Sequence, residues 1–526
     1  MFEPNLMNPF GVQANVNAMP NSQILIRDLN LDRVMDRITR QSYIRDTVAK
    51  YLVTPALDAR TIYYRQEVYK DFERLKDTFV EDIFRTVGKT MDIDQSRRGG
   101  SSSQSKINVY EQLKEAIGVA DKYFDLLTEL CEQLRSNRST FESEGMLALT
   151  DKVIAYVDSA EFKELRSILA NISETLQDSK GLKIWVEFGA GLKASTASLC
   201  EISDKPYKAG GFLGGIFSKD KSEIFINKIP EGITNDLENA KKEAILHVKS
   251  IVQAMSAGVS RFFGDLRTEV SFYMGIVKII EKTTELGMPV CFPKVSEGKR
   301  VMNATGLYDM SMVFALNKPK ERMQEDDVIF NDLTMNEGDM LIITGLNQGG
   351  KTTFLRAAGI AQVLMQAGAP VPATSFESSI SDMIYTHFPE EEDKDMKYGK
   401  LAEELARLRE AFEVITGDSL VLLNDSFATT TTGEGSVIAV DVTKAMAALG
   451  CRVIFVSHLF EYASTADQFN ADLAKEGING RAVNFVCGYE EQPDGNVKRT
   501  YKIFPGVPEQ KVFAKEFETA FSASGR

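Results

Sequence analysis

The chain has 526 residues, enough for three or four domains at roughly 150 residues each. Hydrophobic residues make up 43% and charged residues 26% of it, which is typical of a globular protein and excludes a disordered or fibrous one. No apolar run approaches the ~20 residues of a membrane span, and residues 1–20 show no signal-peptide pattern. Five scattered cysteines without a CxxC pair argue against a zinc site or disulfide framework and favour a cytoplasmic protein.

The net charge of −14 at first disfavours a nucleic-acid binder, but it is unevenly distributed. Residues 1–300 hold 41 basic and 42 acidic residues, whereas residues 301–526 hold 20 and 33. The objection therefore applies to the second part of the chain. The first part is nearly neutral, which neither excludes nor supports binding to DNA.

Helical periodicity dominates the first three hundred residues. After an extension over residues 1–24, we expect a helical core and lever domain over residues 25–300, with a small β-containing insertion at about 181–230. The stretches with apolar residues at helical spacing are 29–53, 59–90, 109–138, 151–177 and 236–286.

From residue 301 to residue 526 the pattern changes to short apolar strands that alternate with helices. The clearest strands are residues 340–344, 420–423 and 453–456. This alternation predicts an α/β domain, in which a parallel sheet is covered by helices.

A glycine-rich loop follows the first of these strands. Its residues fit the pattern G-x-x-x-x-G-K-[ST], in which backbone N–H groups surround a phosphate. Lys351 would reach the β and γ phosphates as a catalytic group, and the Thr352 hydroxyl would ligate Mg²⁺. We predict a nucleotide site, the alternative being a loop that no longer binds. The predicted binding residues are Gly345, Leu346, Asn347, Gln348, Gly349, Gly350, Lys351, Thr352 and Thr353.

A second element is the apolar strand that ends in Asn424 and Asp425. An acidic strand end of this kind places a carboxylate beside the Mg²⁺ ion and the attacking water. We therefore predict Thr352, Asn424 and Asp425 as metal ligands and Asp425 as a catalytic group. Asn424 is neutral and should hold Mg²⁺ more weakly than a carboxylate would. The alternative is that the pair only caps a turn.

Residues 344–353 resemble the phosphate loop of the MutS DNA mismatch-repair ATPases, which has an asparagine and a double glycine in the same slots. The resemblance covers roughly residues 25–515 and is specific only from Phe330 to His458. It implies a P-loop, ABC-like ATPase domain preceded by a mostly helical core and lever domain, with ATP and Mg²⁺ as cofactors. The other landmarks are Phe330-Asn331-Asp332-Leu333, Val371-Pro372-Ala373, Asp425 and Ser457-His458.

The chain departs from the family pattern at several of these positions. The family usually has proline where Leu346 stands, commonly methionine at Gln348, and Asp-Glu where this chain has Asn424 and Asp425. Asp425 takes the slot of the water-activating glutamate but is one methylene shorter, which makes slow hydrolysis the expectation. The resemblance further implies that His458, a catalytic candidate, senses the γ-phosphate.

The resemblance also implies a homodimer, because a signature segment of one subunit completes the partner's site. Residues 397–404 are the candidate, with Gly399 in the place of the family's serine, and an ordinary helix is the alternative. The family's adenine-stacking aromatic aligns near Val328, with Phe330 and Tyr308 as nearby substitutes.

We predict a slowly hydrolysing, nucleotide-gated DNA clamp in repair or recombination; the alternative is a nucleotide-switched protein scaffold that does not bind DNA. The family's Phe-x-Glu mismatch wedge is expected to be missing, because Phe79-Val80-Glu81 and Phe162-Lys163-Glu164 both lie within helical patterns. Basic residues that would contact the DNA backbone, unless they are merely solvated, are Arg33, Arg37, Arg40, Lys208, Lys219 and Lys221.

Overall fold

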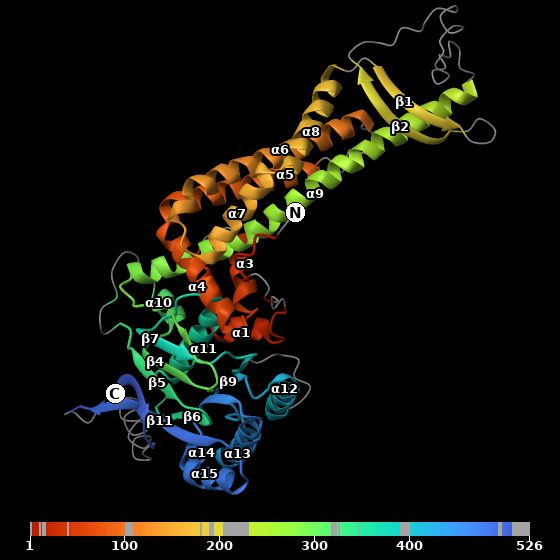
Figure 1. The fold of residues 1–526 in the computed structure, drawn as a ribbon. Coiled ribbons are helices and arrows are strands. Elements are labelled where there is room, and N and C mark those ends of the chain that lie inside the picture. The colour runs from red at the N-terminus through yellow and green to blue at the C-terminus, as the bar shows by residue number, and fades with distance from the viewer. Residues whose placement is uncertain are drawn as a thin grey trace, which may run out of the picture. The chain divides into compact units, whose positions relative to one another are not determined.

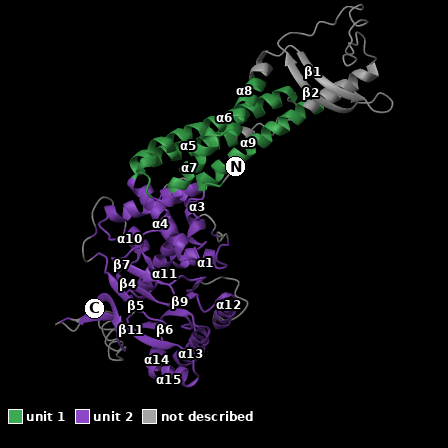
Figure 2. Cartoon of the chain, in the orientation of Figure 1, with its two compact units in different colours: residues 1–4, 75–142, 146–268 green, residues 5–74, 143–145, 269–526 purple. Residues whose placement is uncertain are grey.

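The chain divides into two compact units (Figure 2). One unit comprises residues 1–4, 75–142 and 146–268, and the other comprises residues 5–74, 143–145 and 269–526. The boundary expected at residue 300 does not coincide with this division, and the assignment of domains stays a prediction. The computed structural model describes residues 3–9, 12, 17–38, 42–99, 109–178, 181–188, 194–203, 231–316, 323, 327–346, 348–389, 400–492 and 497–507.

The first unit is mostly helical. A π-helical segment (Lys76–Val80) leads into α5 (Glu81–Gly99), and α6 (Val109–Asn137) lies beside α5 (Figure 1). After α7 (Glu144–Asp158) and α8 (Ala160–Asp178), the strands β1 (Gly181–Phe188) and β2 (Ala194–Ser203) pair antiparallel. Strands are thus present within the predicted β-containing region, whose assignment as an insertion stays a prediction. The helix α9 (Glu231–Glu285) follows and continues into the second unit.

The two phenylalanines of the Phe-x-Glu strings are buried in this helical unit. Phe79 is 3% exposed and packs edge to face against Phe141, and Phe162 is 4% exposed and packs against Phe124. Neither ring can act as a wedge between bases while it is part of the core, as the helical patterns predicted.

The second unit begins with α1 (Ser22–Asp28), α2 (Leu31–Met35), α3 (Ser42–Leu52) and α4 (Ala59–Arg74). The single helical pattern expected over residues 29–53 is wrong, because α2 ends at Met35 and α3 begins only at Ser42. Asn30, which precedes α2, has a left-handed φ of 52° that asparagine tolerates, so α1 and α2 are also separate helices.

The break has a consequence for the predicted basic stripe. Because α2 ends at Met35, Arg33 and Arg37 do not share a helix, and the Arg37 guanidinium donates to the carbonyl of Phe314. Arg40 lies outside the described residues, as do Lys208, Lys219 and Lys221.

A six-stranded sheet forms the centre of the second unit. Its strands are β6 (Asp339–Thr344), β8 (Ile384–His387), β9 (Leu420–Asn424), β10 (Arg452–Val456), β11 (Arg481–Glu491) and β12 (Val497–Pro505), in the order β12-β11-β6-β10-β9-β8. All neighbours are parallel except β11 and β12. Every residue of β6, β9 and β10 is buried, as expected where helices cover both faces. The predicted parallel sheet is therefore confirmed.

Helices cover both faces of this sheet. One face packs against α11 (Lys351–Ala367), where Gly359 approaches Leu422. The other face forms a hydrophobic core with α12 (Lys400–Val414), α13 (Thr432–Leu449), α14 (Phe460–Ser464) and α15 (Ala466–Lys475). The alternation of side chains along each strand divides the apolar residues between the two cores.

A smaller mixed sheet lies within the same unit. Its order is β3 (Lys294–Val295), β7 (Ser375–Ser378), β4 (Met302–Leu307) and β5 (Asn331–Met335), and α10 (Met310–Ala315) follows β4. Among the described residues, no helix combines the length and apolar character that crossing a bilayer requires.

Candidate functional site

The glycine-rich loop joins the central strand β6 to the first turn of α11. Gly345 has a φ of 134° and Gly350, which precedes the helix, has a φ of 92°. The pairing of Val486 with Thr344 brings Cys487 beside Gly345, where a Cβ atom would lie 2.8 Å from the Cβ of Cys487. Only glycine fits the backbone conformation and the space at residue 345.

Lys351 is held on the inner side of this loop. Its side chain is buried, and its ammonium donates to the carbonyl oxygens of Gly345 (2.9 Å) and Leu346 (3.0 Å). Leu346 is buried, whereas Gln348 is exposed with a left-handed φ of 59°. Asn347 lies outside the described residues. The loop therefore holds a cation at its centre through the backbone oxygens of Gly345 and Leu346.

Thr352 and Asn424 meet across 72 positions of sequence. The Thr352 hydroxyl donates to Oδ1 of Asn424 over 2.8 Å. Asn424 is the last residue of β9 and pairs with Val456 of β10, so its side chain emerges at the carboxyl edge of the sheet. Two of the three predicted metal ligands thus present neighbouring oxygen atoms, which suit a hard cation such as Mg²⁺.

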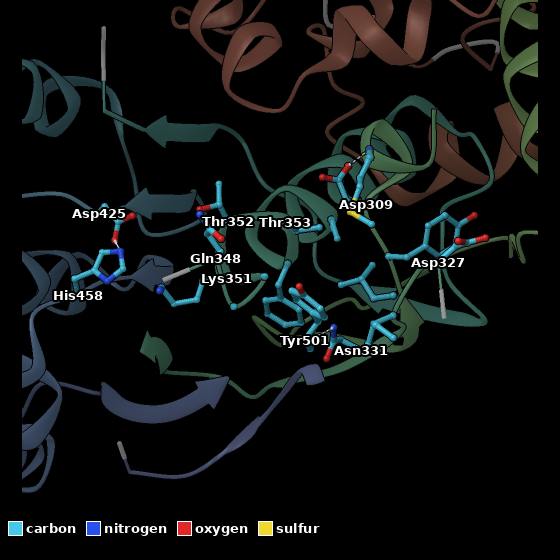
Figure 3. A pocket seen from close by; sticks show the side chains of 18 residues that line it. Asp309, Asp327, Asn331, Gln348, Lys351, Thr352, Thr353, Asp425, His458 and Tyr501 are labelled. Atoms are coloured by element: carbon cyan, nitrogen blue, oxygen red, sulfur yellow. Dashed lines mark hydrogen bonds and ion pairs between the residues drawn. The ribbon is translucent and has the colours of Figure 1, made fainter. Parts of the chain in front are cut away.

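Asp425 and His458 face each other across the same edge (Figure 3). His458 Nε2 lies 3.2 Å from Asp425 Oδ1, although the two atoms lack hydrogen-bond geometry. The Asp425 N–H donates to the carbonyl of Val456, the last residue of β10. Because β9 and β10 are parallel neighbours, their carboxyl ends deliver both side chains to one place.

A pocket of about 500 Å³ connects these residues (Figure 3). Of the predicted site residues, Gln348, Gly349, Gly350, Lys351, Thr352, Thr353, Asp425 and His458 line it. Gly345, Leu346 and Asn424 lie directly behind that lining, through their contacts with Lys351 and Thr352. The structure therefore brings the described members of the predicted set together around one cavity.

Tyr501 lines the pocket, and the sequence analysis missed it. It lies on β12 with a left-handed φ of 56°, is 46% exposed, and its carbonyl accepts from the side chain of Asn331 (3.1 Å). A Cβ at Gly350 would lie 3.5 Å from its ring. No local pattern marks this tyrosine, because only the antiparallel pairing of β12 with β11 brings it to the loop.

The candidates for adenine stacking differ in position. Tyr308 lines the pocket, but it is buried, and its hydroxyl donates to the carbonyl of Pro289. Phe330 packs against Tyr308 with ring centroids 5.6 Å apart, whereas Val328 is buried. The next residue, Asp309, also lines the pocket; it caps α10, and burial raises the pKa of its carboxyl. Of these two aromatics, Tyr308 lines the pocket and Phe330 does not.

The segment proposed to complete a partner's site is described only from Lys400 onward. Its last residue, Glu404, is buried on α12, where its carboxylate accepts hydrogen bonds from Phe427 and Thr429 of its own chain.

His387, at the end of β8, is a residue to which the sequence pattern assigned no role. Its Nδ1 shares a 2.8 Å hydrogen bond with the hydroxyl of Ser426.

The fold and the pocket define an α/β protein whose site lies at the carboxyl edge of a parallel sheet. A family model described as the MutS2 N-terminal domain matches residues 57–286, and one described as MutS domain V matches residues 341–507. Two stretches that together make up most of the chain thus match domain models of the MutS family.

Curated proteins named for DNA mismatch repair are similar to the chain. The DNA mismatch repair protein MutS of Petrotoga mobilis is 23% identical over 93% of this chain and 61% of its own length. The MutS protein of Symbiobacterium thermophilum is 34% identical over 26% of the chain, and the probable DNA mismatch repair protein Msh6 of Drosophila melanogaster is 33% identical over 26%. These two matches cover 16% and 11% of those proteins. The chain thus spans less than two thirds of the relatives that it matches.

Proposed function

We propose that this protein is a Mg²⁺-dependent ATPase of MutS type, with a P-loop, ABC-like domain, whose nucleotide state gates a DNA-binding clamp in repair or recombination. The observation that carries the proposal is the convergence of Lys351, Thr352, Asn424, Asp425 and His458 at one edge of the sheet.

Each side chain has a role that its chemistry supports. The Lys351 ammonium exchanges loop carbonyls for β- and γ-phosphate oxygens, while backbone N–H groups of the loop bind the same anion. Thr352, Asn424 and Asp425 hold Mg²⁺, which neutralises charge on the phosphates when it is bound. Asp425 orients the attacking water, and His458 donates to the γ-phosphate.

Two features favour slow hydrolysis. Asn424 supplies a neutral amide oxygen in place of a charged carboxylate, so Mg²⁺ is bound more weakly. Asp425 reaches one methylene less far than a glutamate would, and its carboxylate lies against His458. Both features fit a clamp that changes state on binding nucleotide and turns over rarely.

The ATPase proposal is tested by measuring phosphate release with and without Mg²⁺. We expect slow, Mg²⁺-dependent release by the wild type and none above background by Lys351→Ala. Lys475→Ala, which removes an exposed lysine of α15 in the same domain, is the matched control and should retain full activity. Equal release by the wild type and Lys351→Ala would refute the proposal.

The DNA part of the proposal competes with a protein scaffold that never binds DNA. Anisotropy titrations with duplex, mismatched and branched DNA, with and without ATP at two salt concentrations, separate the two. Salt-sensitive binding that depends on nucleotide supports the clamp, because backbone contacts release counterions. Absence of binding to every form at low salt would favour the scaffold.

We also propose a homodimer, since a composite nucleotide site requires a second subunit. Light scattering at micromolar concentration with ATP measures the mass directly. A monomer under these conditions would contradict the proposed dimer. The ATPase proposal would still be tested independently by the phosphate-release measurement.

A further inference from the structure

Two residues of the loop formed by residues 425–429 adopt strained backbone conformations. Asp425 has a φ of 48° and Phe427 has a φ of 67°, both in the left-handed region that residues with a Cβ atom avoid. Such conformations persist only where the surroundings hold them, and they concentrate at functional sites. The conformation of this loop determines where the Asp425 carboxylate points.

Glu404 is the side chain that holds the second strained residue. Its Oε1 accepts the Phe427 N–H over 2.8 Å, and its Oε2 accepts the Thr429 hydroxyl over 3.2 Å. Glu404 is only 7% exposed, and Phe427 is fully buried in the core, where its ring packs against Phe455. A buried carboxylate makes strong, charge-assisted hydrogen bonds, so both of its oxygens fix the loop from α12.

Asp425 and Ser426, the first two residues of the loop, also make hydrogen bonds to neighbouring strands. The Asp425 N–H donates to Val456, and the Ser426 hydroxyl shares a hydrogen bond with His387 at the end of β8. In the described structure Glu404 does not line the pocket, whereas Asp425 does. Glu404 thus contacts the loop at Phe427 and Thr429 but does not line the pocket.

We propose that Glu404 is a positioning residue, which orients Asp425 for hydrolysis by holding the Phe427 N–H. The role rests on the proposed ATPase function. It predicts a loss in the rate of the chemical step without a loss in nucleotide affinity, because Glu404 does not line the pocket that Lys351 and the described residues 348–350 of the glycine-rich loop line.

The test compares Glu404→Ala with Glu404→Gln in the full chain. We expect Glu404→Ala to lower single-turnover hydrolysis at least tenfold, while the Kd for a fluorescent ATP analogue changes less than twofold. Glu404→Gln should restore at least half of the wild-type rate, because its amide oxygen accepts the Phe427 N–H and its NH₂ donates to Thr429. Glu410→Ala, at an exposed position of α12, is the matched control and should behave as the wild type.

Amide hydrogen exchange of residues 425–429 provides a second readout that does not need activity. Protection of this segment should be lost in Glu404→Ala and kept in Glu404→Gln. A Glu404→Ala rate within twofold of the wild type, a parallel loss of affinity, or unchanged protection would overturn the positioning role. An inactive wild type would overturn the proposed function, and the exchange measurement would still decide whether Glu404 holds the loop.

Discussion

Replacing Asn424 by aspartate tests whether its oxygen lies beside the Mg²⁺ ion. Thr352 Oγ1 lies 2.8 Å from Asn424 Oδ1, so with a Mg²⁺–oxygen distance of about 2.1 Å for Thr352 the new carboxylate lies no more than about 4.9 Å from the ion. The substitution changes a neutral neighbour of the ion into a charged one and leaves the shape of the side chain almost unchanged.

The size of the effect follows from Coulomb's law. At ~4.9 Å a single negative charge and a divalent cation attract by about 1.7 kcal/mol even at the dielectric constant of water, and by more in a half-buried site. Part of this gain is offset, because residue 424 is 7% exposed and the new charge lies next to Asp425. We expect a net gain of about 1.4 kcal/mol, a tenfold fall in the Mg²⁺ concentration for half-maximal nucleotide binding.

The assay titrates Mg²⁺ at fixed protein and fluorescent ATP analogue. Asn479→Asp adds the same charge at an exposed position outside the pocket lining and should leave the Mg²⁺ requirement unchanged. In a Thr352→Val background the gain should shrink, because the hydroxyl that places the ion is gone. An Asn424→Asp protein that is folded yet needs as much Mg²⁺ as the wild type, or more, would refute the placement of the ion.

Two further predictions concern the glycine-rich loop and three thiols that are partly or fully buried. Gly345→Ala should abolish nucleotide binding and lower the free energy of unfolding by about 1–3 kcal/mol. Residue 345 has a φ of 134°, and the added Cβ atom would lie 2.8 Å from the Cβ of Cys487. An unchanged urea midpoint and an unchanged Kd for nucleotide would contradict this prediction. Burial raises the pKa of the thiols of Cys291, Cys451 and Cys487 from 9.0 to about 11. The pKa of these thiols is higher in the folded protein than in the unfolded chain. Their contribution to the free energy of unfolding is therefore fully present below pH 9 and is lost as the pH rises towards 11. Urea denaturation should therefore show a lower midpoint at pH 10 than at pH 8, and an equal or higher midpoint would count against the buried thiols.

Local patterns in the sequence were enough to predict much of the fold. The helical period indicated α6 over nearly its full length, and short apolar runs indicated the central strands. Both signals are local, because burial of one face of a helix or of both faces of a strand determines the spacing of apolar residues along that segment. The pattern was wrong over residues 29–53, where α2 ends at Met35 and α3 begins only at Ser42, an interruption that the apolar periodicity did not indicate.

The phosphate-loop motif and the two strand ends were likewise determined by the sequence alone, since each is a short run of residues whose chemistry is local. Only the tertiary structure decided what surrounds them. Thr352 meets Asn424 across 72 positions, and strand register brings Cys487 and Tyr501 against the glycines of the loop. Glu404 binds the amide of Phe427 because α12 packs beside the end of β9. Such contacts join residues far apart in the chain, and their partners are chosen by packing and register, which no single segment of sequence specifies.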